Sequence, residues 1–295
     1  MRAESAAGNP LRAACQAVGL DPTDSRLIHD HATSVHVLPR SGVVVRITSA
    51  RTTSAAVRRA LATTSRLDSA DFPVTVPAPG VDQPIAVEGG RVASFWTYVP
   101  NSEGQAAPGT AELGRLLRRL HDLPSPLLDL PPYVPLRDFR GAVSETRSLT
   151  EDDRMWLLDE SSALLAAYST LKSPLGTGHV HGDAYPGNII GPAESPVLGD
   201  WEETACGPRE LDLANTYQGV RFGRTDADLA AFATEYGYDA REWSGLTTLI
   251  AMRDLHTLGS YIRRAEAGDV DAARELHLRV ESIRRGDRLA RWTTA

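Results

Sequence analysis

Three polar side chains lie close together between residues 180 and 200, in a stretch that is rich in glycine and proline. Asp183 follows a His-Gly pair, Asn188 comes five residues later, and Asp200 follows a short apolar run. A carboxylate can orient an attacking hydroxyl and accept its proton, while an amide oxygen and a second carboxylate are hard ligands that suit Mg²⁺ and not zinc. The spacing therefore indicates phosphoryl transfer, with Asp183 as the catalytic base and Asn188 and Asp200 as ligands of Mg²⁺.

The small residues around these side chains fit that interpretation. Gly182, Pro186 and Gly187 allow the sharp turns that would bring the three polar groups together. A structural alternative remains open, in which Asp183 and Asn188 are turn-forming residues that satisfy loop amides.

The segment from His181 to Ala214 resembles the catalytic and metal loops of the aminoglycoside phosphotransferase and choline kinase family. The resemblance is carried by the His-Gly-Asp, Asn and Asp-Trp residues and by the stretch Gly207–Ala214. Members of this family share a bilobal protein-kinase-like fold. The resemblance implies the roles given above for Asp183 and the two metal ligands, and it implies His181 as a loop-shaping residue. It also implies Asp212 as a buried acid that hydrogen-bonds the catalytic loop as structural support.

The rest of the chain fits the α+β, two-lobed fold that this resemblance implies. We expect a five-stranded-type antiparallel sheet with one helix in a nucleotide-binding lobe, residues 1–100. A mostly helical lobe, residues 101–295, is expected to hold the catalytic loop, the metal loop and the acceptor site, with the nucleotide in the cleft between the lobes. Local patterns predict strands at 43–47, 85–87 and 92–99, helices at 54–67, 111–121, 226–236, 243–267 and 271–285, and a helix start at Thr150.

Two segments of the first lobe resemble nucleotide-binding parts of the family. Phe95–Pro100 resembles the strand that leads into the linker between the lobes, which implies that Tyr98 and Val99 lie beside the base of ATP or GTP. A buried edge strand with aromatic core residues is an alternative for this segment, and both can hold. Residues 31–36 lie where the phosphate-binding loop of the family would be, so Ser34 is a candidate phosphate contact, although a plain hairpin turn fits equally well.

The residues expected to bind the nucleotide phosphates depart from the family pattern. Kinase-like folds hold the α- and β-phosphates with a strand lysine that is tethered by a helix glutamate. Here the strand carries Arg46, no glutamate occurs between Arg46 and Glu88, and Ala60 falls near the place of the missing glutamate. We favour Arg46 as the phosphate ligand, because a guanidinium is always charged and can bind bidentately. The alternatives are a non-catalytic nucleotide-binding pseudokinase and an arginine that merely faces solvent.

Acidic residues beside the metal loop bear on the acceptor. Glu202 and Glu203 lie close to Asp200 in the sequence, and acids near a binding site attract a cation. We therefore expect a cationic acceptor such as an aminoglycoside or a related antibiotic, whose phosphorylation would give resistance. The alternatives are a choline-like or other metabolic alcohol, and acids that are simply solvated. A protein substrate is disfavoured, because no segment of activation-loop length separates Asp200 from Gly207.

The composition of the chain further limits the class of protein and its partners. The 295-residue chain has a formal net charge of −7, which disfavours nucleic-acid binding. Two cysteines far apart, no apolar amino-terminal stretch and no run of membrane-spanning length predict a cytoplasmic protein with reduced thiols and no membrane partner. The expected partners are therefore a nucleoside triphosphate with Mg²⁺ and a small-molecule hydroxyl acceptor.

Overall fold

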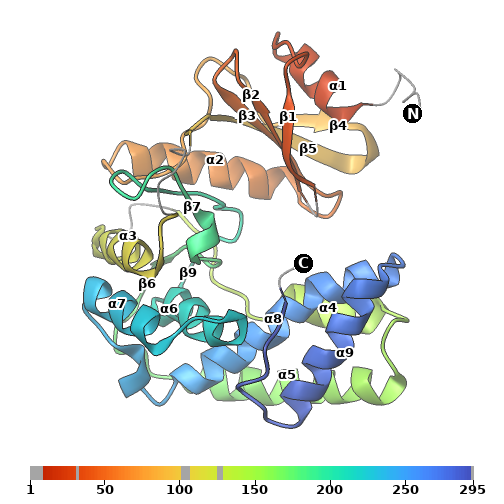
Figure 1. The fold of residues 1–295 in the computed structure, drawn as a ribbon, viewed down its shortest axis with the longest axis vertical. Coiled ribbons are helices and arrows are strands. Elements are labelled where there is room, and N and C mark those ends of the chain that lie inside the picture. Colours follow the sequence, from red (N-terminus) through yellow and green to blue (C-terminus); the bar gives the residue numbers. More distant parts are fainter. Residues whose placement is uncertain (1–8, 31–32, 101–106, 125–128, 294–295) are drawn as a thin grey trace. The chain divides into compact units, whose positions relative to one another are not determined.

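The computed structural model of the protein describes residues 9–30, 33–100, 107–124 and 129–293. Its contacts divide the chain into two compact units (Figure 1). The N unit comprises residues 1–108 together with 187–204, and the C unit comprises residues 109–186 together with 205–295. The predicted boundary at residue 100 assigns segment 187–204 to the C-terminal lobe, whereas the contacts of this segment are made with the N unit.

A five-stranded antiparallel sheet, as predicted, forms the centre of the N unit, in the order β1-β2-β3-β5-β4. Its strands are β1 (Arg26–Asp30), β2 (Ser34–Leu38), β3 (Val43–Ile47), β4 (Ile85–Val87) and β5 (Arg91–Thr97). Side chains alternate between the two faces of a strand. Val43, Val45 and Ile47 of β3 therefore share one buried face, while Val44 and Arg46 lie on the other.

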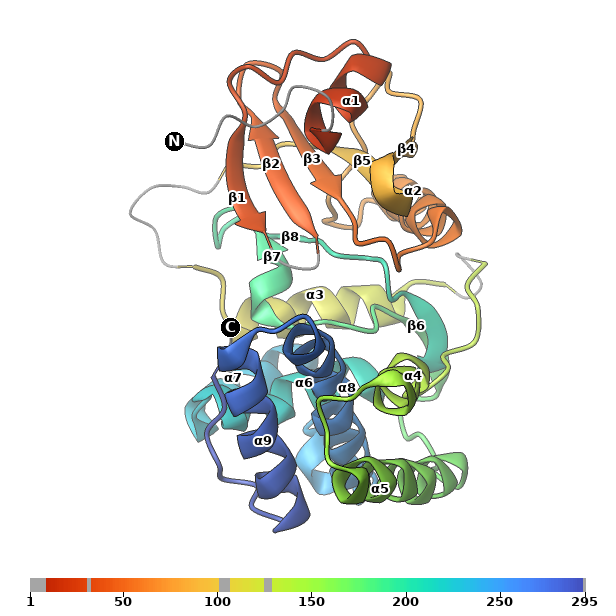
Figure 2. The ribbon, with the colours of Figure 1, turned by 90° about the vertical axis from the view of Figure 1, so that its right-hand side faces the viewer.

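Two helices, α1 (Pro10–Ala17) and α2 (Ser54–Asp68), cover the two faces of this sheet (Figures 1 and 2). Leu11 of α1 packs into the core on one face, and Val57 of α2 packs on the face that also carries Arg46. The prediction of a single helix in this region was therefore wrong. α1 spans only 8 residues, too few for a repeat to be recognised, although the Asn9 side chain caps it and a proline opens it, which are both helix-start signals.

A short hairpin, β7 (Ile189–Ile190) and β8 (Val197–Leu198), also belongs to the N unit. The backbone N–H of Leu198 donates to the carbonyl of Pro73 at 3.0 Å, and the N–H of Thr75 donates to the carbonyl of Leu198 at 3.1 Å. These bonds attach the predicted metal loop to the N unit.

The C unit is mostly helical, as predicted, with one two-stranded sheet in its described part. Its elements are α3 (Thr110–Asp122), α4 (Arg137–Glu145), α5 (Glu151–Ser169), β6 (Thr177–Val180), β9 (Ala205–Pro208), α6 (Glu210–Gln218), α7 (Asp226–Tyr236), α8 (Leu246–Glu266) and α9 (Val270–Arg284). Short 3₁₀ segments of the whole chain are Glu88–Gly90, Pro186–Asn188, Gly219–Phe222 and Ala240–Glu242. α8 contacts α4, α5, α6 and α9, so it is the central helix of this unit.

The predicted helices of the C unit are confirmed, and the Thr150 side chain caps α5 by accepting from the N–H of Asp153. α4 was not predicted, because it starts after Leu136, whose left-handed backbone and apolar side chain provide no cap signal. None of the helices in the described ranges is long and apolar enough to cross a membrane.

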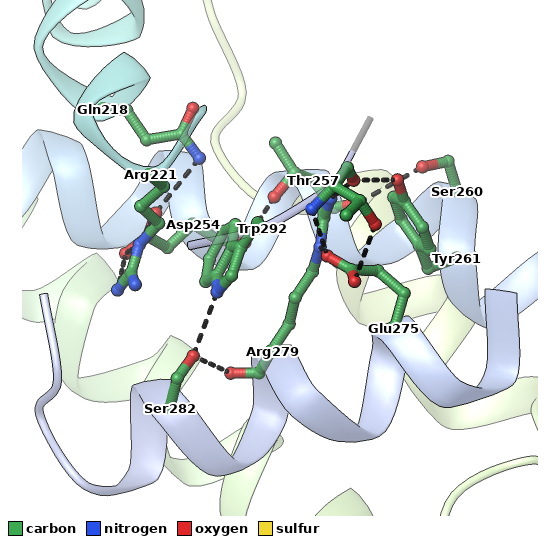
Figure 3. Close-up of polar contacts among 11 residues, drawn as sticks. Gln218, Arg221, Asp254, Thr257, Ser260, Tyr261, Glu275, Arg279, Ser282 and Trp292 are labelled. Atoms are coloured by element: carbon green, nitrogen blue, oxygen red, sulfur yellow. Dashed lines mark hydrogen bonds and ion pairs between the residues drawn. The ribbon is translucent and has the colours of Figure 1, made fainter. Parts of the chain in front are cut away.

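The last residues of the C unit are held by a cluster that we call the arginine clamp: Arg221, Asp254, Glu275, Arg279 and Trp292 (Figure 3). Arg221 donates to Asp254 from Nε at 2.9 Å and from Nη2 at 2.7 Å, and both side chains are buried. The Trp292 ring centroid lies 4.0 Å from the guanidinium carbon of Arg221 and 4.8 Å from that of Arg279. Because Arg279 also pairs with Glu275 at 2.8 Å, every charge of the clamp is neutralised within the protein.

Candidate active site

The predicted catalytic loop begins directly after β6 in the C unit, and its backbone is fixed by one buried carboxylate. Asp212, in the first turn of α6, is fully buried. It accepts hydrogen bonds from the backbone N–H groups of His181 and Gly182, both at 2.8 Å, and it lies 3.0 Å from Nε2 of His121. The N–H of Asp183 donates to Nδ1 of His181 at 3.3 Å. His181 and Asp212 thus hold the loop that presents Asp183.

Asp212 is suited to hold the loop as a charged acceptor. Burial alone would raise its pKa, but the hydrogen bond and charge of His121, with further contributions from His181, lower the pKa of Asp212 below its ordinary value. The other ring nitrogen of His121 lies 2.8 Å from the Tyr236 hydroxyl. The contacts that link Tyr236 to Asp212 through His121 were not predicted, because α3 and α7 are far from the catalytic loop in sequence.

The Asp183 carboxylate is partly exposed and forms an ion pair with Arg253 of α8. Sequence reasoning missed Arg253, since it lies 70 residues after Asp183 in a helix with no motif around it. The structure thus places a cation beside the predicted catalytic base within the C unit.

The two predicted Mg²⁺ ligands are brought together in the N unit by the β7–β8 hairpin. Asn188 is buried just before β7, and its backbone carbonyl accepts from the N–H of Gly199 at 2.9 Å. Asp200 follows Gly199 with a positive φ of 66°, which non-glycine residues rarely adopt and which recurs at functional sites. Its side chain is 43% exposed. An amide oxygen and an accessible carboxylate are a donor set that fits Mg²⁺, which keeps several waters and needs few protein ligands.

Arg46, on β3, faces two carboxylates of this same unit. Its Nη2 lies 2.8 Å from Oδ1 of Asp200 and 3.2 Å from Oε1 of Glu202. Burial would lower the pKa of Arg46, but Asp200 and Glu202 raise it. Burial raises the pKa of Glu202 to about 8, against the opposing effect of Arg46. With this raised pKa Glu202 is largely protonated near pH 7, so Asp200 balances the charge of Arg46, and a further cation beside the cluster would favour the ionised form of Glu202. We call these three residues the Arg46 cluster.

This cluster supplies Arg46 with carboxyl partners that α2 does not supply. Ala60 is buried on α2, so α2 provides no carboxylate there, and the carboxylate partner of Arg46 comes from Glu202, beyond the hairpin. Sequence reasoning assigned Glu202 to the acceptor because its distant partner, 156 residues earlier, could not be seen. Glu203 is exposed, and its assignment to the acceptor stays a prediction.

The remaining predicted nucleotide contacts lie in the N unit. Tyr98 and Val99 follow the end of β5, where Tyr98 is exposed and donates its N–H to the carbonyl of Gly42 at 2.9 Å. Val99 packs against Gly191, where an added Cβ would lie 3.1 Å from a Val99 methyl carbon. Ser34 is the first residue of β2, which pairs with β1 as a hairpin. Of the predicted loop 31–36, residues 31 and 32 lie outside the described residues.

Comparisons with known proteins identify a family from the sequence and a fold from solved structures. A sequence model described as "Phosphotransferase enzyme family" matches residues 29–246. No curated protein matches the sequence significantly. Among solved structures, an amicoumacin kinase in complex with AMP-PNP, Ca²⁺ and Ami has a TM-score of 0.75 at 13% identity, covering 96% of this chain and 94% of that one.

Two further structures are similar in fold. A choline/ethanolamine kinase family protein from Mesorhizobium loti has a TM-score of 0.66 at 15% identity, with 96% and 97% of the two chains covered. The GDP complex of a mutant aminoglycoside 2′-phosphotransferase-IIIa has a TM-score of 0.62 at 12% identity, with 95% and 100% covered. At these identities the likeness establishes the fold, and it confirms the predicted protein-kinase-like class.

Proposed function

The chain belongs to the phosphotransferase enzyme family, and we propose that it is a small-molecule kinase that transfers the γ-phosphoryl group of ATP or GTP to a hydroxyl group. One observation carries the proposal. Asn188 and Asp200 flank one hairpin of the N unit, where the Asn188 carbonyl accepts from the N–H of Gly199, and five residues before Asn188 the chain presents Asp183 on a loop that buried Asp212 holds by its backbone. Function depends on such sites and not on the fold alone.

Asp183 is proposed as the base of the reaction. The acceptor hydroxyl oxygen forms a bond to the γ-phosphorus, the bond from that phosphorus to the β,γ-bridging oxygen breaks, and a nucleoside diphosphate leaves. The hydroxyl proton passes to the Asp183 carboxylate. Such a base contributes about 10²- to 10⁴-fold to the rate, and positioning and charge stabilisation supply the rest.

Asn188 and Asp200 are proposed to hold Mg²⁺. When bound, this ion supplies positive charge that neutralises the nucleotide phosphates. The partly exposed Asp200 carboxylate and its left-handed backbone support this role.

Arg46 is proposed to hold the α- and β-phosphates, with Glu202 as its tether. The pseudokinase alternative rests on the absent helix glutamate alone, and Glu202, 3.2 Å from the Arg46 guanidinium, supports the catalytic interpretation instead. Tyr98 and Val99 are proposed beside the base of the nucleotide, and Ser34 near its phosphates.

For the acceptor, the sequence-based proposal is an aminoglycoside or related antibiotic, with a choline-like alcohol as the alternative. The names of similar structures include an amicoumacin kinase and a choline/ethanolamine kinase family protein, which supports a small alcohol as the acceptor class. If the acceptor is an antibiotic, its phosphorylation would give resistance.

A mass-spectrometric screen tests the proposed reaction. The protein would be incubated with Mg²⁺, ATP or GTP and a panel of aminoglycosides, other hydroxylated antibiotics, amino alcohols, sugars and hydroxy acids. We expect at least one acceptor to gain the mass of one phosphoryl group. Asp183→Asn should abolish the gain, while Asp159→Asn, at an exposed position on α5, should not. No product from any acceptor, together with no nucleotide binding, would contradict the proposal.

A further inference from the structure

The ion pair between Arg253 and Asp183 occupies the place where a kinase acceptor must bind. If Asp183 receives the proton of the acceptor hydroxyl, the groups around Asp183 in the C unit select the acceptor. The side chain of Arg253 is 16% exposed and that of Asp183 is 26% exposed, so the pair is mostly buried but still accessible to a ligand. Arg253 is therefore positioned to meet whatever molecule approaches Asp183.

A small pocket in the C unit continues from this pair. It is lined by Arg253 and His256 of α8, by Asn215 of α6, by Gly182 of the catalytic loop and by Tyr133, with apolar side chains of α6 and α8 between them. Because Gly182 adjoins Asp183 in the chain, a molecule in this pocket lies next to the predicted base.

Asn215 supplies an independent sign of a ligand. The residue is 5% exposed, and its side-chain nitrogen has no hydrogen-bond partner within the described part of the chain. Buried polar groups in native proteins are nearly always hydrogen-bonded, so this amide donor, on a residue that lines the pocket, is available to a molecule that binds there.

The charge of the pocket indicates the kind of molecule. Among the described residues that line it, none is acidic. Burial, with Arg253 and Arg263 nearby, lowers the pKa of His256 to about 3, so this ring is neutral near pH 7. The pocket therefore offers a guanidinium and an amide N–H donor, which complement an anionic oxygen acceptor.

We propose that Arg253 and Asn215 form a carboxylate subsite, so that the acceptor of this kinase is a hydroxy acid; this rests on the proposed function. A guanidinium binds a carboxylate through two parallel N–H···O bonds. An acceptor carboxylate would replace Asp183 as the partner of Arg253, which leaves the oxygens of Asp183 to accept from the acceptor hydroxyl. An acceptor that carries only ammonium groups would instead bring like charge to Arg253.

This subsite reverses the acceptor charge expected from Glu202 and Glu203. Glu202 pairs with Arg46 in the N unit, so its carboxyl group already has a partner within that unit. The pocket residues, and not the acids beside the metal loop, then determine which acceptor is phosphorylated.

The test uses acceptor pairs that differ by one carboxylate. L-serine is compared with ethanolamine, and D-glycerate with ethylene glycol, with kanamycin as a polycation. The readouts are kcat/KM for phosphoryl transfer from Mg²⁺-ATP or Mg²⁺-GTP, and ligand binding by saturation-transfer NMR in the presence of Mg²⁺ and AMP-PNP, which needs no turnover. We expect the acid of each pair to be preferred at least about tenfold, because a site built to bond a polar group discriminates strongly against its absence.

Three variants separate recognition from folding. Arg253→Gln should bind neither acid and lose the preference, while Arg253→Lys, which keeps the charge but not the paired donors, should retain part of it. Arg264→Gln is the matched control on the same helix, because Arg264 pairs with Asp269 outside the pocket, and it should keep the full preference. Thermal unfolding checks that each variant is folded.

The outcomes distinguish the two proposals. Acids and their decarboxylated counterparts treated alike, or transfer to kanamycin and ethanolamine only, would overturn the carboxylate subsite and leave the kinase standing. No transfer to any compound would contradict the kinase. In that case, binding of the acids by wild type and not by Arg253→Gln would still support the subsite, and binding of neither acid would reject it.

Discussion

The Arg46 cluster and the arginine clamp use the same ion-pair chemistry in opposite ways. In the clamp, the Asp254 carboxylate accepts from Arg221 and also from Gln218 at 3.0 Å, in a setting where the Arg221 and Asp254 side chains are 5% and 6% exposed. In the Arg46 cluster, one guanidinium serves two carboxylates, and the Asp200 side chain is 43% exposed. The ion pair of the clamp is closed to solvent, whereas the Arg46 cluster contains a carboxylate that solvent can reach.

This difference separates a structural ion pair from a functional one. A buried pair adds little net stability, yet removing one partner leaves the other charge buried and uncompensated, which costs about 3–5 kcal/mol. A partly exposed carboxylate beside a second one is screened by water and can be lost with little effect on folding. The same Asp→Ala change should therefore have opposite consequences in the two clusters.

The largest effect is expected from Asp200→Ala. Loss of a metal ligand should lower Mg²⁺-dependent phosphoryl transfer by roughly 10³-fold, since metal stabilisation of phosphate charge is worth several kcal/mol. The unfolding free energy should change by no more than about 0.5 kcal/mol, because loss of the Asp200 charge lowers the pKa of Glu202, which can then ionise and neutralise Arg46. Transfer rates and urea unfolding, measured on the same preparation, check the expected loss of activity and the expected stability. Full activity of the variant at limiting Mg²⁺ would contradict the assignment of Asp200 as a metal ligand.

Asp254→Ala should show the reverse. It leaves Arg221 buried without its carboxylate, so the unfolding free energy should fall by about 3–5 kcal/mol. Activity per folded molecule should stay within about twofold, because the clamp contributes no group to the proposed reaction. Urea unfolding gives the stability, and rates scaled to the folded fraction give the activity. A stable but inactive Asp254→Ala protein would contradict the distinction between a structural clamp and a functional Arg46 cluster.

A smaller effect is expected from Glu202→Gln. Without a tether that can ionise beside it, Arg46 should hold the phosphates less well, and kcat/KM for the nucleotide should fall about tenfold, the equivalent of one charge-assisted hydrogen bond. Glu203→Gln is the matched control, since Glu203 is exposed, and it should change the nucleotide kcat/KM little. Equal effects of the two substitutions on nucleotide kinetics would argue against the tether.

The smallest effect concerns pH and His256 on α8. Burial with nearby arginines lowers its pKa to about 3 in the folded protein, against an ordinary value near 6.5. Between these values the unfolded chain binds a proton that the folded protein does not. The contribution of His256 to the unfolding free energy is therefore fully present above about pH 6.5. It falls as the pH drops, by up to ~1.4 kcal/mol per pH unit for one proton.

His256→Gln should remove this part of the pH dependence, while His277→Gln, at an exposed site on α9, should not. Denaturant unfolding between pH 7 and pH 5 measures the slopes. Identical slopes for wild type and His256→Gln would mean that His256 is protonated in the folded protein.

Residue spacing within one segment made part of this site predictable. The charge partners that depend on long-range packing could not be predicted. Asp183, Asn188, Asp200 and Asp212 lie within one segment, where turn residues and a family resemblance identify them together. The partners Glu202 of Arg46 and Arg253 of Asp183 are 156 and 70 residues away in the chain, and no residue spacing links such pairs. A charge partner across a fold depends on how the elements pack, which helical and strand periodicity do not specify.

The same limit applies to the fold. The helix α3 repeats its apolar positions over 13 residues, whereas α1 and α4 span only 8 and 9 residues, which are too few turns for a repeat to be recognised. The attachment of hairpin 187–204 to the N unit rests on backbone hydrogen bonds at Leu198, which leave no trace in the side-chain pattern.

The most direct test of the central claim is the rate at which Asp183→Asn forms a phosphorylated acceptor, compared with wild type at matched nucleotide occupancy. Mass spectrometry follows the product, and calorimetric titration of the Mg²⁺-nucleotide complex sets the occupancy. The account predicts transfer by wild type, a rate about 10²- to 10⁴-fold lower in the variant, and nucleotide affinity that is unchanged. Equal transfer rates in the two proteins would contradict the assignment of Asp183 as the base of a kinase.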